Sequence, residues 1–242
     1  MTILITGAGR GIGRQMAMSF AKKGWNVAVN YYKSEEQAKS LVREITANGG
    51  RAQAFFANVA DRQQVQDMAE QVQAEFGGID ALINNAGIAQ QTLFTDLTEQ
   101  QWDEMFAVNV KGVFHCCQSV LPHMLEKQSG KIINISSVWG LVGASCEVHY
   151  SAAKAAIIGF TKALAKELGP SGIQVNCIAP GVVDTQMNGD LDDDTWQELK
   201  EQTPLGRIGT ARDIARLALF LAGDGGDFIT GQVISPNGGF VI

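Results

Sequence analysis

The sequence predicts an α/β fold in three layers, a doubly wound sandwich built on a seven-stranded parallel sheet. Short apolar runs alternate with longer helical patterns along all 242 residues. The apolar runs are continuous, as in strands that are buried on both faces. This alternation implies right-handed strand–helix–strand units, because parallel neighbours need a crossover between them. A hydrophobic fraction of 45% against 18% charged residues is enough for a full core.

The expected strands are short and begin almost at the first residue. They cover residues 3–6, 26–30, 52–56, 81–84, 131–135, 174–178 and 232–235. The helical patterns between them cover residues 13–23, 35–48, 62–76, 100–126, 150–168 and 211–221. No repeat, low-complexity tract or linker divides the chain, so residues 1–242 are expected to form one domain.

Residues 181–207 interrupt this alternation. The segment is polar, contains the acidic run 190–194 and predicts a short helix over 195–202 with Pro204 beyond it. An insertion of this length in a compact domain is usually functional or disordered, so we expect residues 185–207 to form a lid over a substrate site. A solvated surface excursion is the alternative. The acidic run itself fits a solvated helix start, where negative charge suits the helix dipole.

Composition argues against several classes of function. With a net charge of −6 and a pI of about 5.1, the basic face of a nucleic-acid binder is not expected. No segment approaches the roughly 20 apolar residues of a membrane helix. The early first strand leaves no room for a signal peptide, so we expect a cytoplasmic protein. Cys116, Cys117, Cys146 and Cys177 form no C-x-x-C pair and the histidines lack metal-ligand spacing, so free thiols and no metal are expected.

A glycine-rich loop follows the first strand, with the sequence Thr6-Gly7-Ala8-Gly9-Arg10-Gly11-Ile12-Gly13. Glycines at this spacing let the chain turn sharply and let a phosphate approach bare backbone. The following helix would receive a pyrophosphate on its free N–H groups, at the positive end of its dipole. A strand before the loop and a helix after it indicate a dinucleotide site. The residues expected to bind the cofactor here are Gly7, Gly9, Arg10, Gly11, Ile12 and Gly13.

The end of the second strand indicates which nicotinamide cofactor is bound. Enzymes that select NAD commonly place an acidic residue there for the ribose 2′-OH, and Asn30 takes that place in this chain. A 2′-phosphate would be attracted by Arg10, with Lys33 and Ser34 as further partners. We therefore expect NADP(H), with Asn30, Tyr31 and Ser34 among its contacts. The alternative is that Arg10 only pins the loop to neighbouring backbone.

Ser137, Tyr150 and Lys154 form the candidate catalytic group. Ser137 ends the fifth strand, and Tyr150 follows thirteen residues later, where a long helix opens. Lys154 is four residues beyond Tyr150, so both lie on one helical face. A nearby ammonium would lower the Tyr150 pKa from its ordinary value of about 10 toward the working pH, where a general acid/base is most efficient. Ser137 could hydrogen-bond a substrate carbonyl from the other side.

With these residues in place, the chain resembles the short-chain dehydrogenase/reductase family over essentially its whole length. The matching pieces are the loop 6–13, Asn84-Asn85-Ala86-Gly87, Asn109, Ser137, Tyr150-x-x-x-Lys154, Asn176 and Pro180-Gly181. The resemblance implies a Rossmann fold, a homotetramer, and hydride transfer from a nicotinamide to a ketone carbon.

The resemblance also implies a role for each matched residue. Tyr150 resembles the proton donor to the substrate oxygen, Lys154 the residue that holds the nicotinamide ribose, and Ser137 the hydroxyl that orients the carbonyl. Asn109 resembles the residue whose helix kink holds a water, extending a proton relay from Lys154. The other cofactor contacts that the resemblance implies are Asn58, Val59, Asn85, Ala86, Gly87, Pro180, Gly181, Val183 and Thr185. Asn58 stands where the family usually has Asp.

Within the family, the chain most resembles 3-oxoacyl-[acyl-carrier-protein] reductases of fatty acid synthesis. That implies a 3-oxoacyl thioester as substrate and an acyl carrier protein as partner. Those reductases tend to dock the acidic carrier with arginines, where this chain has Gln128 and Ser171. Lys127, Lys131 and Lys166 are near and could substitute, although Lys is not equivalent to Arg at a phosphate or carboxylate site. Another small or protein-bound ketone, such as a ketone on a modified protein lysine, stays open as the substrate.

Four residues besides the lid are expected to shape the substrate pocket, namely Gln90, Trp139, Leu141 and Glu147. Glu147 would suit a polar or cationic substrate better than a plain acyl chain, unless it only faces solvent. A non-catalytic, cofactor-binding regulator is the alternative of a different class. The complete set Asn109, Ser137, Tyr150 and Lys154 argues against it.

Overall fold

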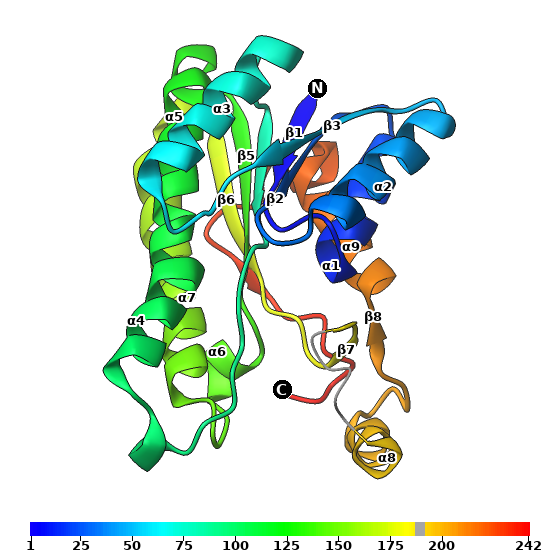
Figure 1. The fold of residues 1–242 in the computed structure, drawn as a ribbon, viewed down its shortest axis with the longest axis vertical. Coiled ribbons are helices and arrows are strands. Elements are labelled where there is room, and N and C mark those ends of the chain that lie inside the picture. Colours follow the sequence, from blue (N-terminus) through cyan, green and yellow to red (C-terminus); the bar gives the residue numbers. More distant parts are fainter. Residues whose placement is uncertain (187–191) are drawn as a thin grey trace.

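A computed structural model describes residues 1–186 and 192–242, which form a parallel sheet covered by helices on both faces (Figure 1). Seven strands pair in the order β3-β2-β1-β4-β5-β6-β9, and every neighbouring pair is parallel. The doubly wound Rossmann fold that the sequence predicts is therefore confirmed.

The strands are apolar because both faces of the sheet are covered. All residues of the central strands β1 (Thr2–Ile5) and β4 (Ala81–Asn84) are buried. The remaining strands of the sheet are β2 (Asn26–Tyr31), β3 (Arg51–Phe56), β5 (Gly130–Ile135), β6 (Ile173–Ile178) and β9 (Val233–Ile234). The edge strand β3 is the most exposed of the longer strands, with only Phe55 fully buried.

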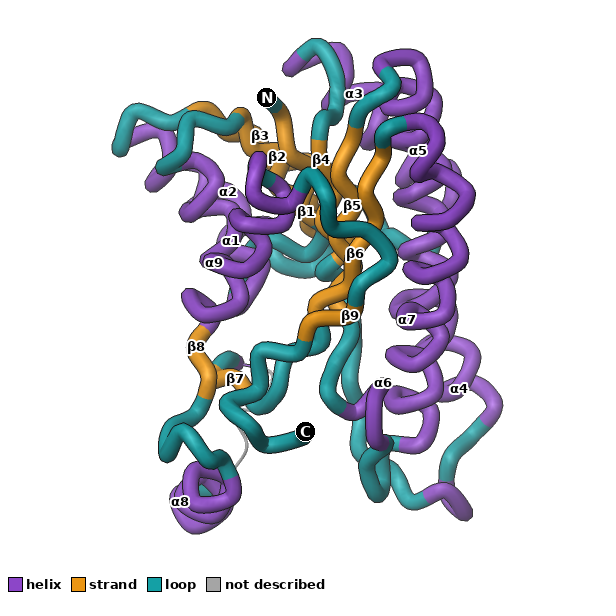
Figure 2. Tube along the Cα trace, turned by 180° about the vertical axis from the view of Figure 1, so that it is seen from behind, coloured by secondary structure: helices purple, strands orange, loops and turns teal. Residues whose placement is uncertain are grey.

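Three long helices lie on each face of the sheet (Figures 1 and 2). On one face are α1 (Gly11–Ala21), α2 (Glu35–Ala47) and α9 (Ala211–Ala222), and on the other are α3 (Arg62–Phe76), α5 (Gly112–Lys127) and α7 (Val148–Leu168). Local signals set their ends. In α3, for example, the Asp61 side chain accepts a hydrogen bond from the N–H of Gln64, and Gly77 ends the helix at φ +83°.

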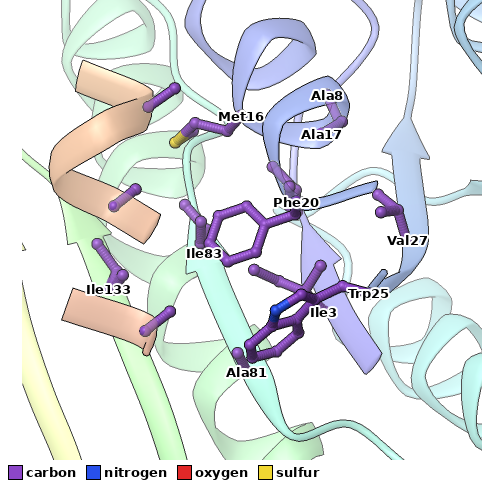
Figure 3. Close-up of a cluster of buried hydrophobic side chains, with 14 of the residues drawn as sticks. Ile3, Ala8, Met16, Ala17, Phe20, Trp25, Val27, Ala81, Ile83 and Ile133 are labelled. Atoms are coloured by element: carbon purple, nitrogen blue, oxygen red, sulfur yellow. The ribbon is translucent and has the colours of Figure 1, made fainter. Parts of the chain in front are cut away.

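Each face of the sheet has its own hydrophobic cluster. Ile3 and Ile5 of β1 belong to the cluster under α1 and α9, whereas Leu4 belongs to the opposite one, as the two-residue period of a strand requires. Figure 3 shows the first cluster, in which the rings of Phe20 and Trp25 pack edge to face at 5.3 Å. These two layers hold the sheet rigid beneath the loops at its carboxyl edge.

The structure differs from the expected elements in three places. The pattern 100–126 is not one regular helix, because α4 (Glu99–Phe106) and α5 are joined by a π-helical turn (Ala107–Lys111). A short helix, α6 (Trp139–Val142), follows β5, and a second small sheet pairs β7 (Val183–Asp184) with β8 (Gly209–Thr210). The helix expected in the insertion is α8 (Asp193–Gln202). The first part of the acidic run, residues 190 and 191, lies outside the described residues.

The strand order fixes where a ligand can bind. Successive strands run outward in one direction from β1 to β3 and in the other from β4 to β9, and open α/β sheets bind ligands in the crevice at this reversal, beyond the carboxyl ends of the strands. Gly7, Asn85, Ser137 and Pro180 follow β1, β4, β5 and β6 at that edge.

Candidate active site

The loop between β1 and α1 leaves bare backbone open to a ligand. Gly7 and Gly11 have φ values of +61° and +54°, in the left-handed region that favours glycine. Helix α1 begins at Gly11, and its N-cap residue, Arg10, makes no side-chain cap hydrogen bond. The first N–H groups of the helix therefore remain free of a side-chain cap, at the positive end of the dipole, which suits a pyrophosphate.

Thr6 and Asn85 clamp this loop to β4. The Thr6 hydroxyl oxygen accepts hydrogen bonds from the N–H groups of Asn85 (2.9 Å) and Ala86 (3.0 Å). The Asn85 amide donates to the carbonyls of Thr6 (2.9 Å) and Gly7 (3.1 Å). A Cβ on Gly7 would stand 2.9 Å from the Cα of Ala86, so a larger residue would push the loop away from β4.

Asn30 serves the loop from inside the protein. Its side chain is 1% exposed. Its amide oxygen accepts from the N–H of Gly7 (3.1 Å), and its amide nitrogen donates to the carbonyl of Ala57 (3.1 Å). Asn30 therefore fixes the glycine loop and the chain beyond β3, and its contact with the cofactor stays a prediction.

The side chains that can meet a 2′-phosphate lie next to Asn30 at the surface. Arg10 and Lys33 are exposed, while Tyr31 and Ser34 are half-buried. Ser34 packs on the glycine loop, since a Cβ on Gly9 would stand 2.7 Å from its Oγ. Arg10 and the Ser34 hydroxyl thus belong to or border the glycine loop, whereas the Lys33 Nζ lies 5.9 Å from the Tyr32 ring centre.

Tyr150 and Ser137 face each other across the end of β5 and the start of α7. Both are almost buried, at 9% and 8% exposure. Burial raises the pKa of Tyr150 to about 12, the negative charge of Glu147 adds to this, and the hydrogen bond with Ser137 opposes it. The Lys154 Nζ lies 5.6 Å from the Tyr150 ring centre, and the lowering of the Tyr150 pKa expected from it does not contribute to this shift. In this state Tyr150 is a protonated donor.

Lys154 lies one turn further along α7 and is 5% exposed. Its Nζ donates to the carbonyl of Ile135 at 3.0 Å, at the end of β5. Burial lowers its pKa to about 8, because an ammonium is disfavoured away from water. The residue is therefore a cation at neutral pH, with a pKa close to the physiological range.

Asn109 sits in the π-helical turn that interrupts the 100–126 pattern. Its amide nitrogen donates to the carbonyls of Ile88 (3.0 Å) and Met105 (3.1 Å), and its amide oxygen accepts from the N–H of Ile88 (3.3 Å). A Cβ on Gly87 would stand 2.6 Å from the Asn109 amide oxygen and 3.4 Å from the Lys154 Nζ. Asn109 and Lys154 thus flank the same bare stretch of backbone.

The remaining predicted cofactor residues follow two strands on opposite sides of the sheet, β3 and β6. Asn58 and Val59 follow β3, and Val59 packs against Gly112, where a Cβ would stand 2.8 Å from its Cγ2. The Asn58 side-chain oxygen accepts a hydrogen bond from the N–H of Ala60 at 3.1 Å. This bond stabilises the turn after β3. Pro180, Gly181, Val183 and Thr185 follow β6.

A cavity of about 590 Å³ opens at this edge of the sheet, within the range typical of small-molecule sites. Asn109, Ser137, Tyr150 and Lys154 all line it. Its wall also contains predicted cofactor residues, namely Ile12, Asn85, Gly87, Pro180, Gly181, Val183 and Thr185. Thr195 and Leu199 reach it from α8, and Gln90, Trp139 and Glu147 line it as well. The other predicted cofactor residues lie beyond it, along the glycine loop and the ends of β2 and β3.

Two residues that the sequence analysis did not single out hold the catalytic helix in place. The Ser136 hydroxyl donates to the carbonyl of Lys154 at 2.7 Å. Gly140 of α6 packs on the same peptide, since a Cβ there would stand 2.7 Å from the carbonyl carbon of Lys154. The glycine shortly after Ser137 was the available signal, but only the packing of α6 on α7 shows why it must be small.

The four cysteines are free thiols, and three of them are buried. Cys116, Cys117 and Cys177 are buried, and burial raises the pKa of each thiol. Residues 1–186 and 192–242 hold no group of three or more potential metal ligands. Within the same residues no helix has the length and apolar character needed to cross a bilayer.

The chain is similar to known proteins along most of its length. A family profile described as short chain dehydrogenase matches residues 1–196. The chain is 47% identical over 236 residues to 3-oxoacyl-[acyl-carrier-protein] reductase FabG of Staphylococcus aureus, covering 98% of this chain and 96% of the relative. It is 41% identical to the reductase of the same name from Thermotoga maritima, covering 99% and 97%. A crystal structure of 3-oxoacyl-[acyl-carrier protein] reductase from Brucella melitensis superposes with a TM-score of 0.93 at 33% identity, covering 100% and 91%.

Proposed function

The chain belongs to the short chain dehydrogenase family, and from that premise we propose that it uses NADPH to reduce a ketone to a secondary alcohol. One observation carries the proposal. Ser137, Tyr150 and Lys154 line one cavity with Asn109 at the carboxyl edge of the sheet, beside a glycine loop with free helix N–H groups.

The loop residues fit a dinucleotide. The uncapped start of α1 suits a pyrophosphate, and the bare backbone of Gly87 lies between Asn109 and Lys154. The choice of NADPH is supported by two exposed cations, Arg10 in the loop and Lys33 after β2, which would attract a 2′-phosphate. No carboxylate ends β2 to repel it.

The cofactor would supply the hydride, and the residues of the chain would polarise the ketone and supply the proton. Ser137 donates a hydrogen bond to the ketone oxygen, which strengthens as negative charge develops there. Tyr150, protonated because burial raises its pKa to about 12, donates the proton to the same oxygen. Lys154 supplies positive charge next to the new phenolate, and Asn109, in its π-helical turn, would hold a water that relays a proton back toward Lys154.

The first substrate class to consider is the 3-oxoacyl thioester, because the relatives carry that name. Docking of an acidic acyl carrier has less support. Gln128 and Ser171 precede β5 and β6, so they lie at the sheet edge opposite the cavity. Lys127 and Lys131, which could have replaced arginines, form ion pairs with Asp80 and Asp227 of the same chain. Our proposal therefore covers the reduction of the ketone and does not include docking of an acyl carrier protein.

The catalytic assignment is tested by Tyr150→Phe. We expect turnover to fall by at least about a thousandfold, because the proton donor is lost, while NADPH still binds. Steady-state NADPH oxidation and fluorescence titration of the cofactor measure the two effects. Turnover near the wild-type rate in this variant would refute the assignment.

The substrate class is tested by a screen with NADPH and NADH against an acetoacetyl thioester and unrelated ketones. Activity on the thioester supports the fatty-acid assignment, whereas activity only on other ketones discards it. Failure on all of them with cofactor still bound would favour the alternative of a non-catalytic, cofactor-binding regulator. The homotetramer that the resemblance implies stays a prediction, which sedimentation velocity can test.

A further inference from the structure

We propose that Glu147 selects the substrate, and that the preferred ketone carries a cationic amine close to its carbonyl group. This inference rests on the proposed reductase function and names the class of ketone that the same cavity takes. It concerns a residue outside the catalytic group, whose side chain no step of the reduction requires.

Glu147 is placed in the cavity by the turn that precedes α7. It lines the same cavity as Tyr150 and is half-buried. Cys146, the residue before it, has a φ of +61°, a conformation that non-glycine residues rarely adopt. The carbonyl of Cys146 accepts a hydrogen bond from the N–H of Thr92 at 2.8 Å. The strained turn is thus tied to the loop after β4, which fixes the direction in which Glu147 leaves the backbone.

Local structure does not account for the carboxylate. Glu147 is the N-cap residue of α7, but its side chain makes no cap hydrogen bond. Among the described residues, the Glu147 side chain takes part in one hydrogen bond, which the Gln91 amide donates to Oε1 at 3.3 Å. Through residues 1–186 and 192–242, the ion pairs present do not include Glu147. The half-buried carboxylate of Glu147 therefore has a neutral amide, and no cation, as its partner in the described structure.

The carboxylate is electrostatically coupled to the reaction centre. Burial raises the pKa of Glu147 itself, and its negative charge contributes to the raised pKa of Tyr150. A cation seated on Glu147 would oppose both effects, since it favours the charged acid and reduces the field that Tyr150 experiences. Such a substrate would gain in binding and would also make Tyr150 a stronger proton donor.

Helix α8 adds to this preference. It contributes Thr195 and Leu199 to the cavity wall, and its ten residues contain four carboxylates against one lysine. These carboxylates do not line the cavity, but they place negative charge on an element that borders it, and such charge attracts cations from solution. Among the described residues that line the cavity, Lys154 is the single cation, and its Nζ is directed to the carbonyl of Ile135.

A matched pair of ketones tests the inference in the complete enzyme with NADPH. One ketone bears a terminal ammonium, its partner is the neutral N-acetyl derivative, and the pair is made with several chain lengths. We expect kcat/KM to favour the ammonium ketone by about tenfold at the best length, a factor typical of a charge-assisted hydrogen bond. In Glu147→Gln that ratio should fall to near one, while Glu147→Asp, which keeps the charge, should retain most of it.

The control is Glu126→Gln, an exposed acid at the end of α5 away from the cavity, which should leave the ratio unchanged. Titration of both ketones into Tyr150→Phe protein with NADPH, with and without Glu147→Gln, measures the preference as binding and does not require turnover. Equal use of the two ketones by the wild type, or an unchanged ratio in Glu147→Gln, overturns the inference and leaves the reductase function standing. Loss of turnover on every ketone in the wild type would instead remove the proposed function, and the titration would still decide the role of Glu147.

Discussion

Lys154 shows how one residue is tuned by its position in the fold. The sequence places it one turn from Tyr150, and the structure buries it against the end of β5. Removal from water lowers its pKa to about 8, while burial keeps the pKa of Tyr150 at about 12. The lysine is therefore the member of the pair that titrates near physiological pH.

This difference predicts a pH dependence for ketone reduction. Activity requires a protonated Lys154, so kcat/KM for the ketone should be constant below pH 8 and fall as the pH rises through that value. Tyr150 stays protonated over the same range and cannot cause the decline. A pH profile at saturating NADPH measures this, and Lys154→Arg, which keeps its charge to higher pH, should lose the decline in whatever activity remains. A wild-type profile that stays flat to pH 10 would contradict the prediction.

At position 140, the space available for a side chain, and not the backbone conformation, restricts the residue to glycine. Its φ is not in the left-handed region, so an alanine would be acceptable to the backbone. A methyl group there would lie 2.7 Å from the carbonyl carbon of Lys154 and 2.8 Å from the Ser136 Oγ. The peptide of Lys154 would have to move, and with it the catalytic ammonium.

Gly140→Ala should therefore lower both stability and turnover. We expect a loss of about 1–3 kcal/mol in the free energy of unfolding from overpacking, with a fall in kcat. Gly159→Ala is the matched control, because Gly159 lies within α7 with open space around it, and alanine there should gain about 0.5–1 kcal/mol. Urea unfolding and steady-state kinetics compare the two, and an equal effect in both variants would argue against the packing role.

At the scale of elements, hydrogen bonds tie the segment between α8 and β8 to the start of α9. Thr210 and Asp213 form a capping box, in which each side chain bonds to the backbone of the other. Arg207, between α8 and β8, holds the Asp213 carboxylate with two hydrogen bonds of 2.8 and 3.1 Å. The Arg207 guanidinium and the N–H of Thr210 hold the pKa of Asp213 well below its usual range.

Removing this cap should destabilise the protein in a pH-dependent way. We expect Thr210→Ala to cost about 1 kcal/mol, and Asp213→Asn somewhat less, because the Arg207 partner is half exposed. Because the pKa of Asp213 is lower in the folded state, its carboxylate stabilises the fold fully above the unfolded-state pKa of 3.8. That stabilisation is lost progressively as the pH falls below 3.8 toward the folded-state pKa. The difference between wild type and Asp213→Asn should therefore shrink as the pH falls below 3.8. Urea unfolding at pH 7 and pH 3 tests this, with Asp224→Asn as an exposed control; a difference that grows in acid would contradict it.

The helix pattern 100–126 shows where sequence reasoning reaches its limit for an element. Its apolar periodicity correctly indicates helix at both ends, in α4 and α5. The π-helical turn between them is accompanied by hydrogen bonds from Asn109 to Ile88, 21 residues away. A local pattern cannot contain such a contact, so the sequence by itself describes the helix as regular. The kink was expected only from the family resemblance.

At the scale of the whole molecule, the site exists because four strand ends meet at one edge. The parallel pairing of β1, β4, β5 and β6 brings residues 7, 85, 137 and 180 to the same side of the sheet. A ligand bound there contacts segments from most of the chain. Its binding free energy therefore adds to the stability of the folded state as a whole.

Thermal unfolding should report the cofactor preference through this coupling. At about a hundredfold its Kd, NADPH should stabilise the fold by about 2.7 kcal/mol, which raises Tm by roughly 5–10 °C for a chain of this size. NADH at the same concentration should raise it less. Arg10→Ala should reduce the difference between the two Tm shifts, because it weakens the binding of NADPH alone. Equal Tm shifts from NADPH and NADH in the wild type would contradict the expected preference for NADPH.

The sequence by itself determined the layers, the parallel sheet and the choice of candidate catalytic side chains. Those features depend on short-range patterns: continuous apolar strands, the glycine loop 6–13, and the four-residue spacing of Tyr150 and Lys154. The tertiary structure alone decided how these side chains behave. It turned Asn30 inward to hold the loop, raised the pKa of Tyr150 instead of lowering it and packed Gly140 against the peptide of Lys154. Each of these outcomes depends on burial and on contacts between distant segments, and such contacts exist only once the chain has folded.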